Sequence, residues 1–211
     1  MSGYLVYHPQ RTLSLFDTRK VYHDAIGGNQ DPYIWHKHFL HTYCHITQMS
    51  PKVGDINFWV SGNNKLRSFT ELYCDLVFVV EHKIYWKEAN SINRDDSIVD
   101  NDNTFQDNYR WFYQHPFKRR KRFTLKATRY TSFQPQDKDG QLLNIIPLLE
   151  GSSFSIESLQ EGLRAGFNSK PMQLGLVAES LYTKISGMAS VKLYGDELEE
   201  IRNNNAQLES K

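Results

Sequence analysis

The chain has 211 residues, a net charge of +1 and two cysteines. This length suits one large domain or one domain with an appendage. Two cysteines exclude a disulfide framework, so a reducing cytoplasm is the expected compartment. The near-zero net charge does not by itself indicate an acidic or a basic partner. Met1–Tyr4 lacks the basic and apolar regions of a signal peptide, and no apolar run approaches the roughly 20 residues of a membrane span, so we expect neither.

The first half of the chain is predicted to be rich in strands. In chain order, β-prone runs lie at Tyr4–His8, Thr12–Phe16, Ile56–Ser61 and Cys74–His82. Gly54 and Asp55 give a turn signal before the third run, which we expect to be the central strand. The fourth run is continuously apolar, as is typical of a strand buried on both faces. Residues 33–48 carry His and aromatic residues at mixed spacing and predict either a helix or an irregular pocket wall.

The second half changes from strands to helices. Phe123–Thr128 alternates apolar and polar residues, which predicts a further strand. From Ser155 onward apolar residues recur at helical spacing, and Pro171 suits the first turn of a second helix. We therefore predict an α+β protein with a β-rich domain at 1–150 and a helical C-terminal extension at 151–211.

The strongest electrostatic feature is a run of cations that local partners cannot neutralise. It consists of Lys118, Arg119, Arg120, Lys121 and Arg122, and Lys126 extends it. A phosphate backbone would release counterions on contact with such a run, so the pattern predicts nucleic-acid binding. The alternative is a solvated edge strand whose charges prevent pairing between sheets.

Several aromatic and polar residues are candidates for a base-binding pocket. Trp59 either packs in the core or stacks on a flipped base, with Asn57 and Ser61 supplying hydrogen bonds. His41 and His45 are spaced for one helical face, as in some metal sites. No second Cys/His cluster has a matching spacing, so we expect no metal and assign both to the pocket lining or to a structural role.

A different pattern suggests catalysis. Glu81 and Lys83 match the E-x-K half of a metal-dependent nuclease, in which Asp55, or less well Asp75, would be the upstream acid. Asp55 has the simpler role of a turn residue. The sequence lacks the G-x-S-x-G elbow, the P-loop and the G-x-G-x-x-G fingerprint, so the hydrolase, NTPase and dinucleotide interpretations lack their motifs. Whether the protein is an enzyme stays open.

Three stretches of the first 135 residues resemble the PUA-like superfamily, nearest to its ASCH, EVE and nucleotide-modification-associated domains. They are Tyr4–Tyr7, Pro51–Trp59 with its K-x-G-D turn, and the apolar run Leu76–Val80. The resemblance implies a small, mostly antiparallel β-barrel with rim helices and a pocket for a nucleobase, sometimes a modified one. The polar insertion at 87–107 and the helical C-terminus depart from the family pattern.

These observations predict a nucleic-acid or nucleotide binding module that recognises a base, modified or unmodified, at the mouth of a barrel, without a bound cofactor. Two alternatives remain open. One is the E-x-K nuclease. The other is a protein-interaction module, such as one acting in phage defence, whose C-terminal helices bind a partner chain or a second copy of this protein.

Overall fold

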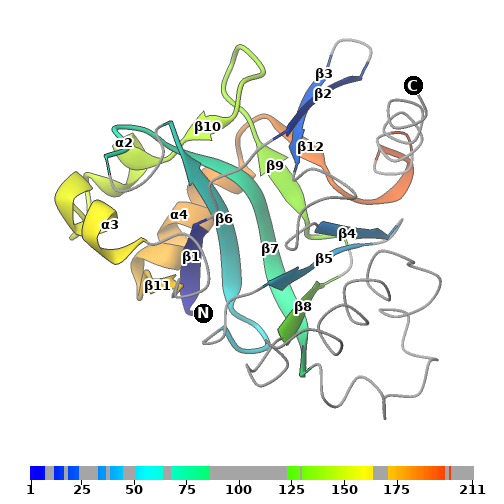
Figure 1. Ribbon diagram of the computed structural model, residues 1–211, viewed down its shortest axis with the longest axis horizontal. Helices are drawn as coiled ribbons and strands as arrows, with labels where there is room; N and C mark the ends of the chain where they lie inside the picture. The colour runs from blue at the N-terminus through cyan, green and yellow to red at the C-terminus, as the bar shows by residue number, and fades with distance from the viewer. Residues whose placement is uncertain are drawn as a thin grey trace, which may run out of the picture.

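The computed structural model describes residues 1–7, 12–16, 19–23, 33–36, 39–44, 51–63, 68–85, 123–128, 130–163, 171–197 and 200. The predicted basic run at 118–122 and His45 lie outside these residues. Figure 1 shows a large twisted sheet with helices gathered on one side of it. None of the helices in the described ranges is both long and apolar enough to cross a membrane.

The main sheet is mixed. Its path runs in the order β11 (Met172–Gln173), β1 (Gly3–Tyr7), β6 (Ile56–Gly62), β7 (Leu72–Tyr85), β8 (Phe123–Ala127), β5 (Phe39–Cys44) and β4 (Tyr33–His36). β1 pairs with β6 in parallel, and the other neighbours on this path are antiparallel. Three short strands lie off the path, namely β9 (Phe133–Pro135), β10 (Leu143–Asn144) and β12 (Ser190–Lys192). β2 (Thr12–Phe16) and β3 (Arg19–His23) form a separate two-stranded sheet.

The predicted α+β class is confirmed, but a closed barrel is not shown. The sheet path ends at β11 on one side and at β4 on the other, and no pairing among the described strands joins these ends. β4 and β5 replace the helix or irregular wall predicted for residues 33–48, which was therefore wrong. Tyr, Ile, Trp, Phe and Thr dominate this segment, and these residues favour a pleated, half-buried surface.

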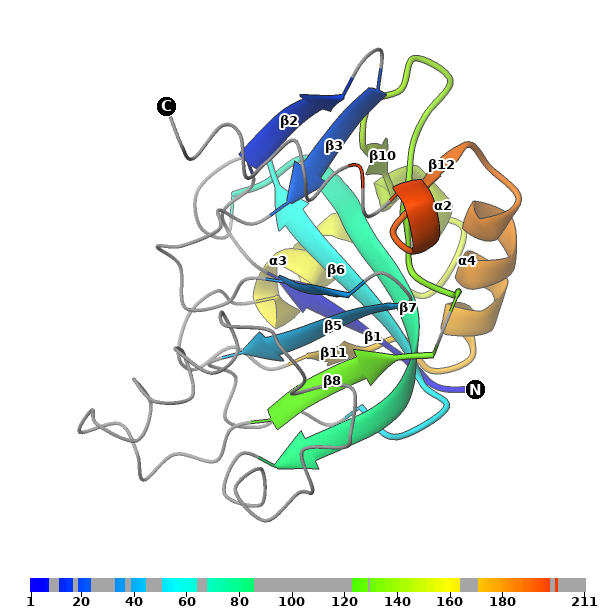
Figure 2. The ribbon, with the colours of Figure 1, turned by 90° about the vertical axis from the view of Figure 1, so that its right-hand side faces the viewer.

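The long strand β7 organises the sheet. One edge pairs with β6, while the other pairs in succession with β10, β9 and β8. Two bulges interrupt its register. The pairing with β6 skips Asp75, and the pairing with β8 skips Glu81. Because bulges bend a strand and increase its twist, β7 turns along its length toward β8 (Figure 2).

Three helices cover one face of β1, β6 and β7. They are α2 (Ile146–Leu149), α3 (Ile156–Gly162) and α4 (Val177–Ser186). The helix predicted from Ser155 is confirmed, since the Ser155 and Ser158 side chains each accept a hydrogen bond from the other's backbone N–H at 3.2 and 3.0 Å. The helix expected at Pro171 begins only at Val177, because Met172 and Gln173 first pair with β1.

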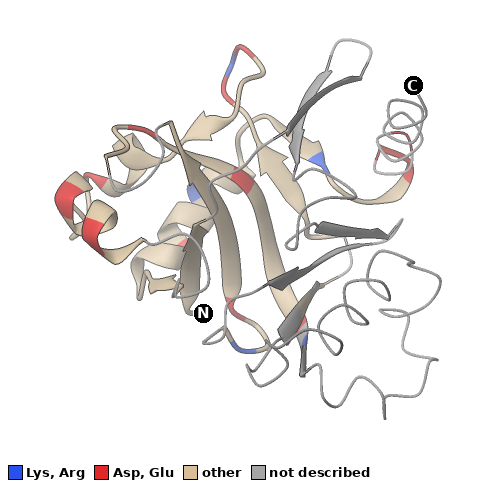
Figure 3. Ribbon diagram, in the orientation of Figure 1, with Lys and Arg blue, Asp and Glu red and all other residues tan. Residues whose placement is uncertain are grey.

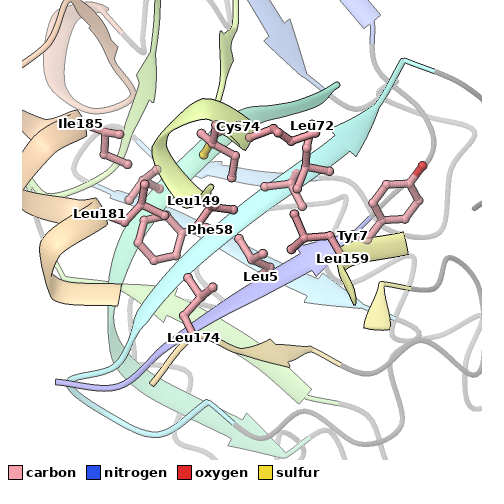
Figure 4. Packing of buried hydrophobic residues seen from close by; sticks show 14 of the residues in the cluster. Leu5, Tyr7, Phe58, Leu72, Cys74, Leu149, Leu159, Leu174, Leu181 and Ile185 are labelled. Carbon is pink, nitrogen blue, oxygen red and sulfur yellow. The ribbon is translucent and has the colours of Figure 1, made fainter. Parts of the chain in front are cut away.

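The hydrophobic core lies between this face and the helices. Leu181 and Ile185 of α4 point toward Phe58 of β6 in Figure 4. β1 and α4 pack so closely that position 3 requires glycine, because a Cβ there would overlap the Cβ of Ala178. The core takes residues from both sides of the boundary predicted at residue 150. That boundary stays a prediction.

Candidate functional site

The face of β1, β6 and β7 that points away from the helices carries the candidate site, and we call it the distal face. Along β6, Ile56, Phe58 and Val60 belong to the helix-covered core. Because neighbouring residues in a strand point to opposite faces, the alternating residues of β6 lie on the distal face. These are Asn57, Trp59 and Ser61, the three residues that the sequence predicts for a base pocket.

Pairing surrounds these residues with apolar neighbours. Trp59 lies between Val6 of β1 and Leu76 of β7, and Asn57 lies between Tyr4 and Phe78. The side chains of Asn57, Trp59 and Ser61 are all completely buried, with 0% exposure. Trp59 is therefore a packed residue of the ligand-free protein rather than an open wall. A base could stack on it only after the structure opens.

The polar atoms beside Trp59 are the unusual feature of this face. Neither Oδ1 nor Nδ2 of Asn57 forms a hydrogen bond, and neither does Oγ of Ser61, within the part of the chain that the structure describes. Burying a polar group without a partner costs about 1–3 kcal/mol. Three such atoms on one strand face therefore lower the stability of the described fold.

Other polar groups are buried elsewhere in the described part of the chain. The buried polar residues within the described ranges are Asp55, Asn57, Ser61, Asp75, Ser132 and Gln134. Gln134 alternates with the core residue Phe133, and its Nε2 donates to the backbone oxygen of the bulge residue Asp75 at 2.8 Å. Because Phe133 belongs to the helix-covered core, Gln134 lies on the side of the sheet that faces away from the helices.

Asp55 performs the turn role predicted for it. Its carboxylate accepts the backbone N–H of Lys52 at 2.8 Å, and Gly54 adopts a positive φ of 86°. The turn is fixed to β7, since the N–H of Gly54 donates to the oxygen of Val80 at 2.8 Å. Burial raises the pKa of Tyr4, and the charge of Asp55 raises it further.

The residues of the nuclease hypothesis, Asp55, Glu81 and Lys83, lie near one another in the fold. Asp55 is paired through its backbone with Val80, next to the bulge residue Glu81. Lys83 pairs with Leu125 of β8, and burial lowers the pKa of Lys83. Within the described ranges, no group of three or more His, Cys, Asp or Glu residues could hold a metal ion. The nuclease hypothesis stays a prediction.

The register brings together two candidate residues from different predicted roles. His41 of β5 lies directly opposite Lys126 of β8, and His82 of β7 lies opposite Lys126 on its other edge. His41 is in a strand, so the helical spacing that linked it to His45 does not apply. Lys126 lies between Leu125 and Ala127, which are both fully buried.

In Figure 3, β1 and β6 carry no charged residue, whereas β7 carries Asp75, Glu81 and Lys83. Ser132 and Gln134 were not predicted to be buried polar residues. β9 has only three residues, all of them buried, so the alternation of apolar and polar residues along it is too short to stand out in the sequence.

Comparison of the chain with protein-family models, with curated proteins and with solved structures finds no match. The resemblance to the PUA-like superfamily stays a prediction that rests on three short motifs. The functional assignment must therefore come from the geometry of the distal face.

Proposed function

We propose that this protein binds a nucleobase-containing ligand, a nucleotide or a nucleotide of a nucleic acid, on the distal face of β6. The observation that carries the proposal is the pair of fully buried side chains, Asn57 and Ser61, whose polar atoms have no partner among the described residues. A fold that retains such groups beside Trp59 gains from them only when a ligand supplies the missing hydrogen bonds.

The chemistry of the two side chains favours a base over other flat molecules. The Asn57 amide offers one acceptor and two donors next to each other, which is the pattern that pairs with the edge of a base. Trp59 would supply a ring for stacking in the same row of side chains once this buried face opens to the ligand. The Cα atoms of residues 57 and 61 are about 13 Å apart at the usual strand rise of 3.3 Å. This span exceeds a base, so Ser61 would meet the sugar or phosphate.

The cluster of positive charges in the sequence is the second observation that supports a nucleotide or nucleic-acid ligand. The cations Lys118 to Arg122 and Lys126 are expected to attract phosphate groups. Such contacts would fix the ligand's backbone while Asn57 reads the base. The PUA-like resemblance implies the same class of ligand.

The decisive experiment measures ligand-induced thermal shifts with the four common nucleosides, their monophosphates and a short single-stranded oligonucleotide. At least one should raise the Tm of the wild type. Asn57→Val should remove this shift and raise the Tm of the ligand-free protein, because an uncompensated amide is replaced by an apolar side chain of similar size.

A matched control is Cys74→Ala, which truncates an equally buried residue in the helix-covered core. It should leave the ligand-induced shift in place. The proposal is wrong if none of these compounds shifts the Tm of the wild type. It is also wrong if Asn57→Val retains the shift, or if it lowers ligand-free stability, which would mean that the amide already has its partner.

A further inference from the structure

A row of basic residues crosses three neighbouring strands of the main sheet. His41 of β5 is the register partner of Lys126 of β8, and Lys126 is also the partner of His82 of β7. Directly opposite residues of antiparallel strands lie on the same face of a sheet, with Cα atoms about 4.5–5.5 Å apart. The three residues therefore share one face, and the Cα atoms of His41 and His82 are about 10 Å apart. We call this set the histidine–lysine row.

The bulge in β7 creates the pairing of His82 with Lys126. Val80 lies opposite Ala127. The next pair joins His82 to Lys126, because the register skips Glu81. An uninterrupted antiparallel register would place Glu81 opposite Lys126. Opposite charges in such a pair stabilise a sheet, and like charges destabilise it. The bulge thus replaces a pair of opposite charges by a pair of basic residues, and this exchange fits a requirement outside folding.

The register of the row is fixed by the opposite face of β8. Leu125 and Ala127 alternate with Lys126 along this strand, and both are fully buried. Because neighbouring residues of a strand lie on opposite faces, Lys126 lies on the other face from these two. Slippage of β8 by one residue would turn Leu125 and Ala127 out of the core. The core contacts of β8 therefore hold the alignment of the histidine–lysine row.

The residues around the row favour an anion as its occupant. At the adjoining positions of the same face, Tyr43 of β5 lies opposite Thr124 of β8, and both residue types can donate a hydrogen bond. Among the register pairs that the structure describes for β5 with β8 and for β8 with β7, none includes Asp or Glu. A metal ion does not suit a row with lysine at its centre, because a lysine ammonium donates three hydrogen bonds and accepts none.

We propose that the histidine–lysine row binds a phosphate group, either as inorganic phosphate or as the terminal phosphate of a monoester. Lysine provides a point charge for phosphate, and histidine provides N–H donors. A terminal phosphate carries about 1.5–2 negative charges at neutral pH, so it gains more from three basic residues than the singly charged phosphate of a diester. The row is a different set of residues from Asn57 and Ser61, and its phosphate site does not depend on base recognition.

The test is thermal unfolding at about pH 6.5, the ordinary pKa of histidine, with inorganic phosphate and with sodium chloride at equal ionic strength as the reference. Phosphate should raise the Tm of the wild type in a saturable way, which gives an apparent Kd. Phenyl phosphate, a monoester, should raise it too, and dimethyl phosphate, a diester, should have a much smaller effect. A shift with inorganic phosphate but none with phenyl phosphate would assign the site to the free ion.

Substitutions in the row connect the shift to these residues. Lys126→Met removes the central charge and keeps an unbranched side chain. It should weaken phosphate binding roughly 10- to 150-fold, the range for a lost hydrogen bond to a charged group. His82→Gln should weaken it as well. Both variants should keep or raise the Tm of the ligand-free protein, because they remove repulsion across the sheet. As a matched control, Lys192→Met removes an exposed lysine from β12 and should keep the wild-type shift.

Two results would overturn the inference at the level of binding. In the first, phosphate shifts the Tm of the wild type no more than chloride does. In the second, Lys126→Met binds phosphate as tightly as the wild type. A lower ligand-free Tm in Lys126→Met would also overturn it, because the lysine would then already have an anionic partner within the chain. The nucleoside-induced shift that reports on Asn57 should persist in Lys126→Met, and the phosphate-induced shift should persist in Asn57→Val, so the two proposals can fail independently.

Discussion

Asn57 and Ser61 interrupt a strand whose other positions could all be apolar. Ile56, Phe58 and Val60 on the same strand are fully buried in the core, and Asn57 and Ser61 are fully buried on the opposite face. Neither polar side chain therefore contacts solvent. Their burial instead lowers the stability of the ligand-free protein. Selection for folding stability alone would favour apolar residues at positions 57 and 61.

Ser61→Ala tests this cost directly. Removing the unpartnered hydroxyl should raise the free energy of unfolding of the ligand-free protein by about 1 kcal/mol. Urea denaturation, with the m-value checked for two-state behaviour, measures the change. A loss of stability on the same substitution would show that Oγ forms a hydrogen bond in solution and would remove half of the argument for a ligand.

Contact between β1 and α4 sets the spacing of the helix layer. Gly3 lies against Ala178 of α4, and its N-terminal neighbour is also fixed, since the backbone oxygen of Ser2 accepts the N–H of Ile56 at 2.9 Å. The backbone on both sides of this contact is therefore held by hydrogen bonds, and it has little room to move apart.

Gly3→Ala should consequently destabilise the protein by about 1–3 kcal/mol, because the new methyl group overlaps Ala178 and forces α4 outward. Thermal unfolding would measure the loss. Ala178→Gly in the same background should recover part of it by making room, although it adds glycine to a helix at a cost of about 1 kcal/mol. Stability equal to the wild type in Gly3→Ala would contradict the close packing.

Elements with a strong local pattern were predictable from the sequence. The continuous run Leu76–Val80 and the turn at Gly54 predicted β7 and the start of β6. The sequence also put Asn57 and Ser61 near Trp59 as candidate hydrogen-bonding residues. The depth of Trp59 was not predictable, because burial depends on what covers a face. Neither was the pairing of His41 with Lys126, because register between distant strands is a property of the whole sheet.

For the whole molecule, three buried acids make the free energy of unfolding fall at alkaline pH, while the pKa of Lys83, which burial lowers, acts in the opposite direction. Burial raises the pKa values of Tyr4, Tyr182 and Cys74. The native state therefore holds these protons more tightly than the unfolded chain. Their contribution to stability is present below the unfolded pKa values, about 8.5 for Cys and 10 for Tyr, and is lost as the pH rises through the folded values.

We expect the urea midpoint to be constant near neutral pH and to fall above about pH 9. Tyr4→Phe removes one titrating phenol and should make this decline shallower. Midpoints measured between about pH 7 and pH 11 for both proteins would check it. An equally steep decline of the urea midpoint in Tyr4→Phe would indicate that Tyr4 does not contribute to the loss of stability at alkaline pH.

The position of β1 in the sheet has a consequence for how the protein is made. Its parallel partner β6 follows within the first third of the chain, but its other edge stays open until Met172 and Gln173 emerge from the ribosome. Closure of that edge, completed when the N–H of Leu174 reaches the oxygen of Gly3 at 2.8 Å, is thus deferred until most of the polypeptide has been synthesised. A nascent chain stalled before this point would present an unprotected strand, and shielding by a chaperone would matter most during that interval.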